Sequence, residues 1–91
     1  MSTVEQDVKI VNKYGLHARP AAKFVKIASR YACEVWVEKD DEEINGKSIM
    51  GLMMLAASQG SVIKVTAEGD GADAALEHLS KLVNSGFEAD C

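Results

Sequence analysis

Apolar and polar residues alternate along several short stretches of the chain, as they do in a strand that buries one face. This alternation predicts strands over residues 4–11, 33–38 and 62–68. Residues 43–45 are predicted to form a short return strand after a turn at Asp40 and Asp41.

Apolar residues recur at helical spacing in two further stretches. The first begins at Ala18, and its apolar positions are Ala21, Phe24, Val25, Ala28 and Ala32. The opposite side of this predicted helix is basic and carries Lys23, Lys26 and Arg30. The second stretch lies near the end of the chain, with apolar positions Ala72, Ala75, Leu76, Leu79, Leu82 and Val83. Gly86 suits the position after this helix, because glycine readily adopts the left-handed conformation common there.

A third, shorter helix is predicted over residues 49–57, with Ser48 as its N-cap. The element order is then β-α-β-β-α-β-α. Each strand has one apolar face and each helix one apolar stripe, so the simplest packing is a four-stranded antiparallel sheet with three helices on one face. The sequence therefore predicts an α+β open-faced β-sandwich in a single domain, residues 1–91, with a ferredoxin-like sheet as the neighbouring topology.

The charge balance narrows the classes of partner. The 91 residues include 10 Lys and Arg against 14 Asp and Glu, a formal net charge of −4. A general nucleic-acid binder needs a basic surface, so this balance disfavours that class. The basic residues Lys9 to Arg30 fall early, whereas residues 38–43 form an acidic run. A locally basic patch of this kind is expected to steer an acidic protein partner.

Targeting and metal-binding features are missing from the sequence. Residues 1–6 lack the basic start and apolar run of a signal peptide, and the apolar stretch 49–57 is too short to span a membrane. Cys33 and Cys91 are predicted to be reduced thiols. No cysteine or histidine has metal-ligand spacing, so neither metal nor cofactor is expected. These features predict a cytoplasmic protein without membrane insertion.

The candidate chemistry lies where the first predicted helix begins. His17 falls at about the N-cap and is followed by Ala18, Arg19 and Pro20. The first turn of a helix has backbone N–H groups without internal partners and a partial positive charge, so it binds phosphate readily. Pro20 is tolerated there, and the N–H groups of Ala18 and Arg19 stay free for an anion. These groups and the Arg19 guanidinium are suited to hold a phosphoryl group on His17.

An isolated histidine at this position would be interpreted as a capping residue, with Arg19 as a solvated charge. The combination of residues instead favours reversible phosphorylation of a ring nitrogen of His17.

Two segments carry a resemblance to a known family. Residues 15–21, GLHARPA, resemble the active-site motif of the HPr family of phosphocarrier proteins of the bacterial phosphoenolpyruvate-dependent phosphotransferase system. Residues 45–53, NGKSIMGLM, resemble the second signature of that family, and the similarity runs from about Val8 to Gly86.

The resemblance implies a relay. Enzyme I, charged from phosphoenolpyruvate, would phosphorylate His17 on Nδ1, and the carrier would pass the group to a histidine or cysteine of an enzyme IIA-type acceptor. Arg19 would stabilise the phosphate, and the protein would be a carrier and not an enzyme. Residues 84–90 and 12–13 resemble the nitrogen-regulatory branch, NPr, whereas the Ser48 segment resembles the sugar-transport branch, so both branches stay open.

Ser48 and its neighbours form the second candidate site. The N-cap role is a sufficient explanation of Ser48, and the resemblance adds phosphorylation by an HPr kinase/phosphorylase as a regulatory step. A phosphate there is compatible with a helix start and would repel an acidic partner. We define the predicted docking surface as Leu16, Lys26, Lys47, Ile49, Met50 and Met53. Exposed methionines adapt to several partners, and a monomer is expected because a shuttle must expose its active face.

Other classes of function are compatible with parts of the sequence. One is a regulatory binding module whose phosphorylation at His17 or Ser48 selects partners without onward transfer. Another is a ferredoxin-like metal or small-ligand binder, for which the chain lacks a Cys-x-x-Cys pair. A free-standing enzyme is disfavoured because no acid–base dyad is evident.

Overall fold

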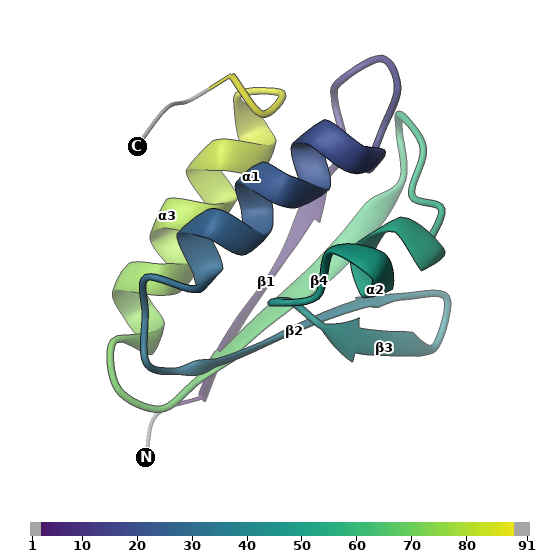
Figure 1. The fold of residues 1–91 in the computed structure, drawn as a ribbon. Helices are drawn as coiled ribbons and strands as arrows, with labels where there is room; N and C mark the ends of the chain where they lie inside the picture. The colour runs from purple at the N-terminus through teal and green to yellow at the C-terminus, as the bar shows by residue number, and fades with distance from the viewer. Residues whose placement is uncertain (1–2, 89–91) are drawn as a thin grey trace.

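A four-stranded antiparallel sheet organises residues 3–88, which are the residues that the computed structural model describes. The strand order is β1-β4-β2-β3. The elements along the chain are β1 (Thr3–Lys9), α1 (Ala18–Ala28), β2 (Glu34–Lys39), β3 (Glu42–Asn45), α2 (Ile49–Met54), β4 (Val62–Glu68) and α3 (Ala72–Asn84). Figure 1 shows α1 and α3 in front of the sheet and α2 beside β3. The predicted element order and open-faced α+β sandwich are confirmed.

The pleat of the strands separates a buried face from an open one. β4 pairs with β1 from Thr3↔Glu68 to Lys9↔Val62 and with β2 from Glu34↔Glu68 to Glu38↔Lys64. The residues that point to the helices are each at most 4% exposed and are Val8, Val35, Val37, Ile63, Val65 and Ala67. Trp36 lies on the other face and is half-buried. The period-two pattern of the sequence therefore sets which face of the sheet the helices cover.

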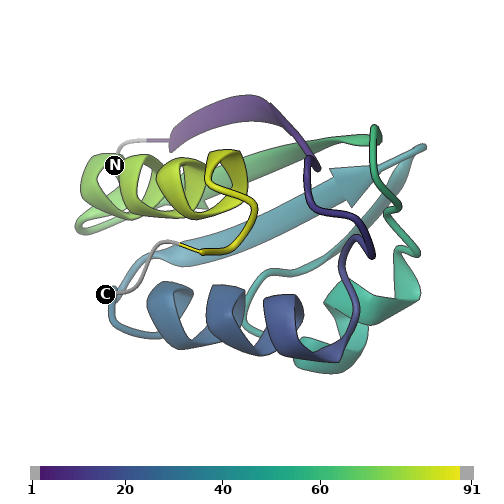
Figure 2. The ribbon, with the colours of Figure 1, turned by 90° about the horizontal axis from the view of Figure 1, so that it is seen from above.

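The helices close the core from one side. α1 contacts both α2 and α3, and α3 lies over β1 and β4. In the view from above, α1 and α3 run side by side, and α2 lies beside the N-terminal end of α1 (Figure 2). α1 buries Phe24 completely, and α3 does the same with Leu79. Each such side chain contributes about 1.5–3 kcal/mol through its removal from water, so this packing fixes the orientation of α1 on the sheet.

Three predicted boundaries differ from the structure by two or more residues, whereas the ends of β2, the start of β3 and the start of β1 differ by one. The first strand ends at Lys9 and not at residue 11. α1 ends at Ala28, so Ala32, which was predicted on its apolar face, follows the helix and is exposed. α2 ends at Met54 and not at residue 57, because the N–H groups of Leu55 and Ala56 bond to carbonyls three residues back and Ala56 has φ 52°. These short-range bonds tighten the last turn and redirect the chain.

The described residues bear on the predictions about free thiols, membrane-spanning helices and metal sites. Cys33 is a buried free thiol, and Cys91 lies outside the described residues. Within residues 3–88 there is no helix of the length and apolarity that crossing a membrane requires. Over the same range, no three His, Cys, Asp or Glu side chains gather in a way that could hold a metal ion.

Candidate functional site

His17 occupies the N-cap of α1 with its side chain left out of the cap. Its backbone is extended, with φ −83° and ψ −171°, and its carbonyl accepts the N–H of Ala21 at 3.0 Å. The imidazole makes no capping hydrogen bond and is exposed. In the described part of the chain, no hydrogen bond uses the N–H groups of Ala18 or Arg19. A nucleophilic ring therefore lies beside two free donors at the positive end of a helix.

The loop before His17 is held by hydrogen bonds to its surroundings. Asn12 donates from Nδ2 to the carbonyl of Gly15 at 2.8 Å, and Leu16 donates its N–H to the carbonyl of Ala57 at 2.9 Å. Gly15 has φ +66°, and a Cβ at this position would collide with the carbonyl oxygen of Ala57. Only glycine satisfies both demands, so the residue two positions before the histidine is fixed by its backbone and by the Ala57 contact.

Leu16 corrects one prediction for the docking surface. Its side chain is 4% exposed and belongs to the core cluster. The hydrogen bond to Ala57 draws this residue inward between two exposed neighbours, Tyr14 and His17. Leu16 therefore fixes the loop from inside and offers a partner only the small part of its side chain that reaches the surface.

Tyr14 is an exposed aromatic neighbour of His17. Its ring lies 5.9 Å from the imidazole between centroids, at an interplanar angle of 81°, and Lys13 Nζ lies 5.3 Å from the Tyr14 centroid. The edge-to-face arrangement is a preferred geometry for aromatic pairs. Tyr14 thus restricts the imidazole on one side while it stays 71% exposed itself.

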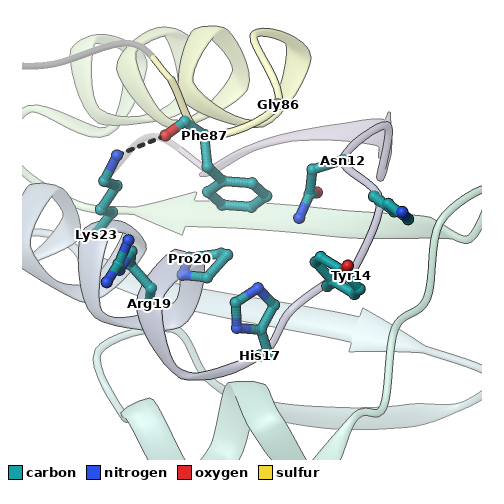
Figure 3. Close-up of a pocket in the computed structure, with 9 residues that line it drawn as sticks. Asn12, Tyr14, His17, Arg19, Pro20, Lys23, Gly86 and Phe87 are labelled. Atoms are coloured by element: carbon teal, nitrogen blue, oxygen red, sulfur yellow. Dashed lines mark hydrogen bonds between the residues drawn. The ribbon is translucent and has the colours of Figure 1, made fainter.

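A cleft of about 410 Å³ opens on one side of His17. Its lining comes from the loop before α1, the first two turns of α1 and the chain just after α3, namely Asn12, Lys13, Tyr14, His17, Arg19, Pro20, Lys23, Gly86 and Phe87. Three of these residues are basic and none is acidic. Figure 3 shows Arg19 and Lys23 along one wall, with Tyr14 and Asn12 opposite them. The cleft is suited to an anion.

A second hollow of about 290 Å³ lies on the α2 side of the histidine. It is lined by Tyr14, Leu16, His17, Met53, Ala56, Ala57 and Ser58. The exposed apolar side chains of α2 continue from it, with Ile49 41%, Met50 75%, Met53 44% and Met54 67% exposed. The structure therefore brings His17 and the α2 part of the docking surface together.

The two lysines of the docking surface differ in exposure and in hydrogen bonding. Lys26 is exposed on α1. Lys47 is half-buried, and its ammonium donates to the carbonyl of Tyr31 at 2.8 Å. Lys47 therefore ties the segment before α2 to the end of α1 as well as carrying a charge.

Ser48 is the N-cap of α2, as the sequence predicted. Its Oγ accepts the N–H of Gly51 at 3.0 Å, and its backbone is extended with φ −115°. The side chain is half-buried. Capping explains this geometry fully.

Five side chains that line the cleft were missed by the sequence analysis as functional candidates: Asn12, Lys13, Tyr14, Lys23 and Phe87. The spacing of Lys23 four residues after Arg19 was a usable signal, since residues four apart share a helix face. Phe87 gave no such signal, because it reaches the cleft only through the way the chain leaves α3.

The comparisons with known proteins agree on one family. The family model of the PTS HPr component phosphorylation site matches residues 4–85. The phosphocarrier protein HPr of Neisseria meningitidis is 49% identical over 84 residues, which cover 92% of this chain and 94% of the relative.

Solved structures give the same result. The crystal structure of HPr-C-His from Thermoanaerobacter tengcongensis matches with a TM-score of 0.91 and 49% identity, covering 97% of this chain and 99% of that one. A crystal structure of an HPr dimer from the same organism matches with a TM-score of 0.76 and 51% identity, covering 90% and 94%.

Proposed function

Because the chain belongs to the HPr family of phosphocarrier proteins of the phosphotransferase system, we propose that His17 accepts a phosphoryl group from enzyme I and passes it to an enzyme IIA-type acceptor. Members of this family carry phosphoryl groups between proteins and are not enzymes. One observation carries the assignment to His17: its exposed imidazole stands at the N-cap of α1 without taking part in the cap.

The transfer is a displacement at phosphorus. A lone pair of His17 Nδ1 attacks the phosphoryl group on the donor, a new N–P bond forms, and the bond between phosphorus and the donor atom breaks. The electron pair of that bond stays on the donor. The reverse roles apply when His17 gives the group to an acceptor histidine or cysteine. Since the imidazole of His17 is exposed, a partner can reach it directly and no enclosed pocket is needed.

The backbone and Arg19 stabilise the charge of the phosphohistidine. The free N–H groups of Ala18 and Arg19 are donors in a fixed position, so they cost no reorganisation when the charge arrives. The Arg19 side chain is exposed and is directed along the wall of the cleft towards Lys23 (Figure 3). It reaches the phosphoryl group by rotation about its side-chain bonds and then binds it as a planar, permanently charged donor.

Phosphorylation by enzyme I and phosphoenolpyruvate tests this function. The wild-type protein and the His78→Ala variant are expected to take up one acid-labile, base-stable phosphoryl group, and His17→Ala none. Labelling of His17→Ala at the wild-type level would show that another residue is the acceptor. Transfer of the label from the isolated phosphoprotein to an IIA-type acceptor separates a carrier from a regulatory module, which would retain the label.

We further propose that Ser48 is a regulatory site for an HPr kinase/phosphorylase. Its support is the position of Ser48 directly before the exposed side chains of Ile49 and Met50. A phosphate at Ser48 adds negative charge beside the docking surface and weakens the approach of an acidic partner. Incubation with such a kinase and ATP should label the wild-type protein and not Ser48→Ala. Label on both proteins would exclude this assignment.

The cellular location, the oligomeric state and the branch of the system are inferred as well. We infer a cytoplasmic location, because phosphoenolpyruvate is produced inside the cell. We infer a monomer, because a carrier that meets several partners in turn must keep His17 and the docking surface accessible. Light scattering of the purified protein tests the monomer against the dimer that the Thermoanaerobacter relative forms. Both the sugar and the nitrogen branch are compatible with the site, and the acceptor that receives the label distinguishes them.

A further inference from the structure

Lys23 joins the first helix to the end of the last one. Its ammonium donates to the backbone carbonyl of Phe87 at 2.8 Å, across 64 positions of sequence. Both residues line the cleft beside His17, and Figure 3 shows this bond across the upper part of the cleft. The bond therefore connects two walls of the proposed phosphohistidine site.

The end of α3 explains why the Phe87 carbonyl is available. Gly86 and Phe87 both have positive φ, 72° and 66°. The N–H of Gly86 donates to the carbonyl of Val83 at 3.0 Å, and that of Phe87 to the carbonyl of Leu82 at 2.9 Å. These two bonds form a Schellman motif, which ends the helix and reverses the chain. The Phe87 side chain is 3% exposed, so the reversed chain is anchored in the core.

The end of α3 and the Phe87 carbonyl are electrostatically unfavourable for an anion in the cleft. The C-terminal end of a helix carries partial negative charge, and a carbonyl beyond it is a further negative pole. A phosphoryl group in the cleft would be repelled by a bare Phe87 carbonyl. Lys23 covers that carbonyl with a positive charge. It also lies four residues after Arg19, which places both cations on one face of α1.

We propose that Lys23 is a positioning residue for phosphoryl transfer at His17, because its bond to Phe87 holds the C-terminal wall of the cleft and covers the carbonyl that would oppose the incoming anion. The inference rests on the proposed function of His17. Lys23 acts through Phe87 and through the shape of the cleft. Its loss should therefore affect the transfer step and leave the binding of enzyme I at the docking surface unchanged.

Three variants isolate the effect of the bond between Lys23 and Phe87. Lys23→Met keeps the length of the side chain and removes its donor and charge, whereas Lys23→Arg keeps both. Lys81→Met is the matched control, since Lys81 is an exposed lysine in the last turn of α3 and does not line the cleft. The control removes one positive charge from the same end of α3 without touching Phe87. Thermal unfolding curves check that each variant is folded at the assay temperature.

The first readout does not depend on phosphorylation. Amide hydrogen exchange at Gly86 and Phe87 in the unmodified protein should become several-fold faster in Lys23→Met, because the chain after α3 has lost its tie to α1. Lys23→Arg and Lys81→Met should exchange like the wild-type protein. Unchanged exchange in Lys23→Met would overturn the role of Lys23 in holding the wall.

The second readout is the rate of phosphorylation by enzyme I as the carrier concentration varies. Lys23→Met is expected to lower kcat by about tenfold with an unchanged KM, and Lys23→Arg to recover most of it. A wild-type kcat in Lys23→Met, a raised KM instead of a lowered kcat, or an equal loss in Lys81→Met would overturn the proposal while His17 remained the acceptor. Failure of the wild-type protein to become labelled would overturn the proposed function itself.

Discussion

The N–H of Leu16 donates to the carbonyl of Ala57 at 2.9 Å, and this bond fixes the loop before His17 to the segment after α2. Both residues are buried, at 4% and 3% exposure. Three further contacts tie the same two segments together, from Ile10 to Ser61, from Gly60 to Ile10 and from Gln59 to Val11. The nucleophile and the α2 part of the docking surface therefore keep a constant relative position.

Gly15→Ala tests this connection. The substitution places a Cβ against the carbonyl of Ala57 at a residue with φ +66°, so we expect a loss of about 3 kcal/mol in unfolding free energy and slower phosphorylation of His17. Gly60→Ala is the control, because Gly60 has φ +93° but nothing within 4 Å of an added Cβ. It should cost about 1–2 kcal/mol from backbone strain alone. Urea unfolding measures both, and equal losses would show that the contact with Ala57 is unimportant.

Two residues of α2, one exposed and one buried, distinguish an effect on docking from an effect on stability. Met50 is 75% exposed, and Leu52 is completely buried. Met50→Ala should change the unfolding free energy by less than about 0.5 kcal/mol and raise the KM for phosphorylation by enzyme I several-fold. Leu52→Ala should lower the unfolding free energy by about 2–5 kcal/mol. A wild-type KM in Met50→Ala would remove this methionine from the docking surface.

Substitutions of Ser48 distinguish its role as an N-cap from the effect of a negative charge at this position. Ser48→Ala removes the acceptor for the Gly51 N–H and should cost about 1 kcal/mol of unfolding free energy. Asn and Asp are good N-caps, so Ser48→Asn and Ser48→Asp should retain stability. Only the aspartate adds charge beside the docking surface, and it should slow phosphorylation of His17 at low salt, with recovery at high salt. Equal rates for the Asn and Asp variants at low salt would argue against electrostatic regulation here.

Tyr31 and His78 provide a stability test at the end of α1 opposite to His17. The Tyr31 hydroxyl and His78 Nδ1 lie 2.9 Å apart in a half-buried hydrogen bond, with the rings edge to face. Tyr31→Phe should lower the unfolding free energy by about 1 kcal/mol and leave the phosphorylation rate unchanged. Tyr14→Phe removes a hydroxyl from a ring that is 71% exposed and should have almost no effect on stability. A phosphorylation defect in Tyr31→Phe would mean that packing at this end of α1 affects His17.

The sequence predicted best those elements whose limits have local causes. β4 was predicted with its exact bounds, because its alternation stops at residues 60–61 and at Gly69. The N-cap positions of His17 and Ser48 also follow from local rules. By contrast, Ala32 continues the apolar spacing of α1 after the helix has ended, since the N–H groups of Arg30 and Tyr31 bond three residues back and tighten the turn.

The remaining features depend on contacts between distant segments. Leu16 was predicted to lie at the surface because it precedes His17 in the sequence. The hydrogen bond from its N–H to the carbonyl of Ala57 holds it in the core instead. The contact from Lys23 to Phe87 depends on how α1 and α3 pack and on the chain reversal after α3. Periodicity within one element describes its own faces and carries no information about which helix ends meet.

The identity of the nitrogen that carries the phosphoryl group tests the assignment of the transfer to His17. Long-range proton–nitrogen NMR spectra of the protein, recorded before and after phosphorylation by enzyme I, report on the ring nitrogens of His17 and His78 separately. We expect a new phosphorus-coupled signal at Nδ1 of His17 and unchanged nitrogens in His78. Phosphorylation of His78, attachment at Nε2 of His17, or a label on no histidine would contradict this expectation.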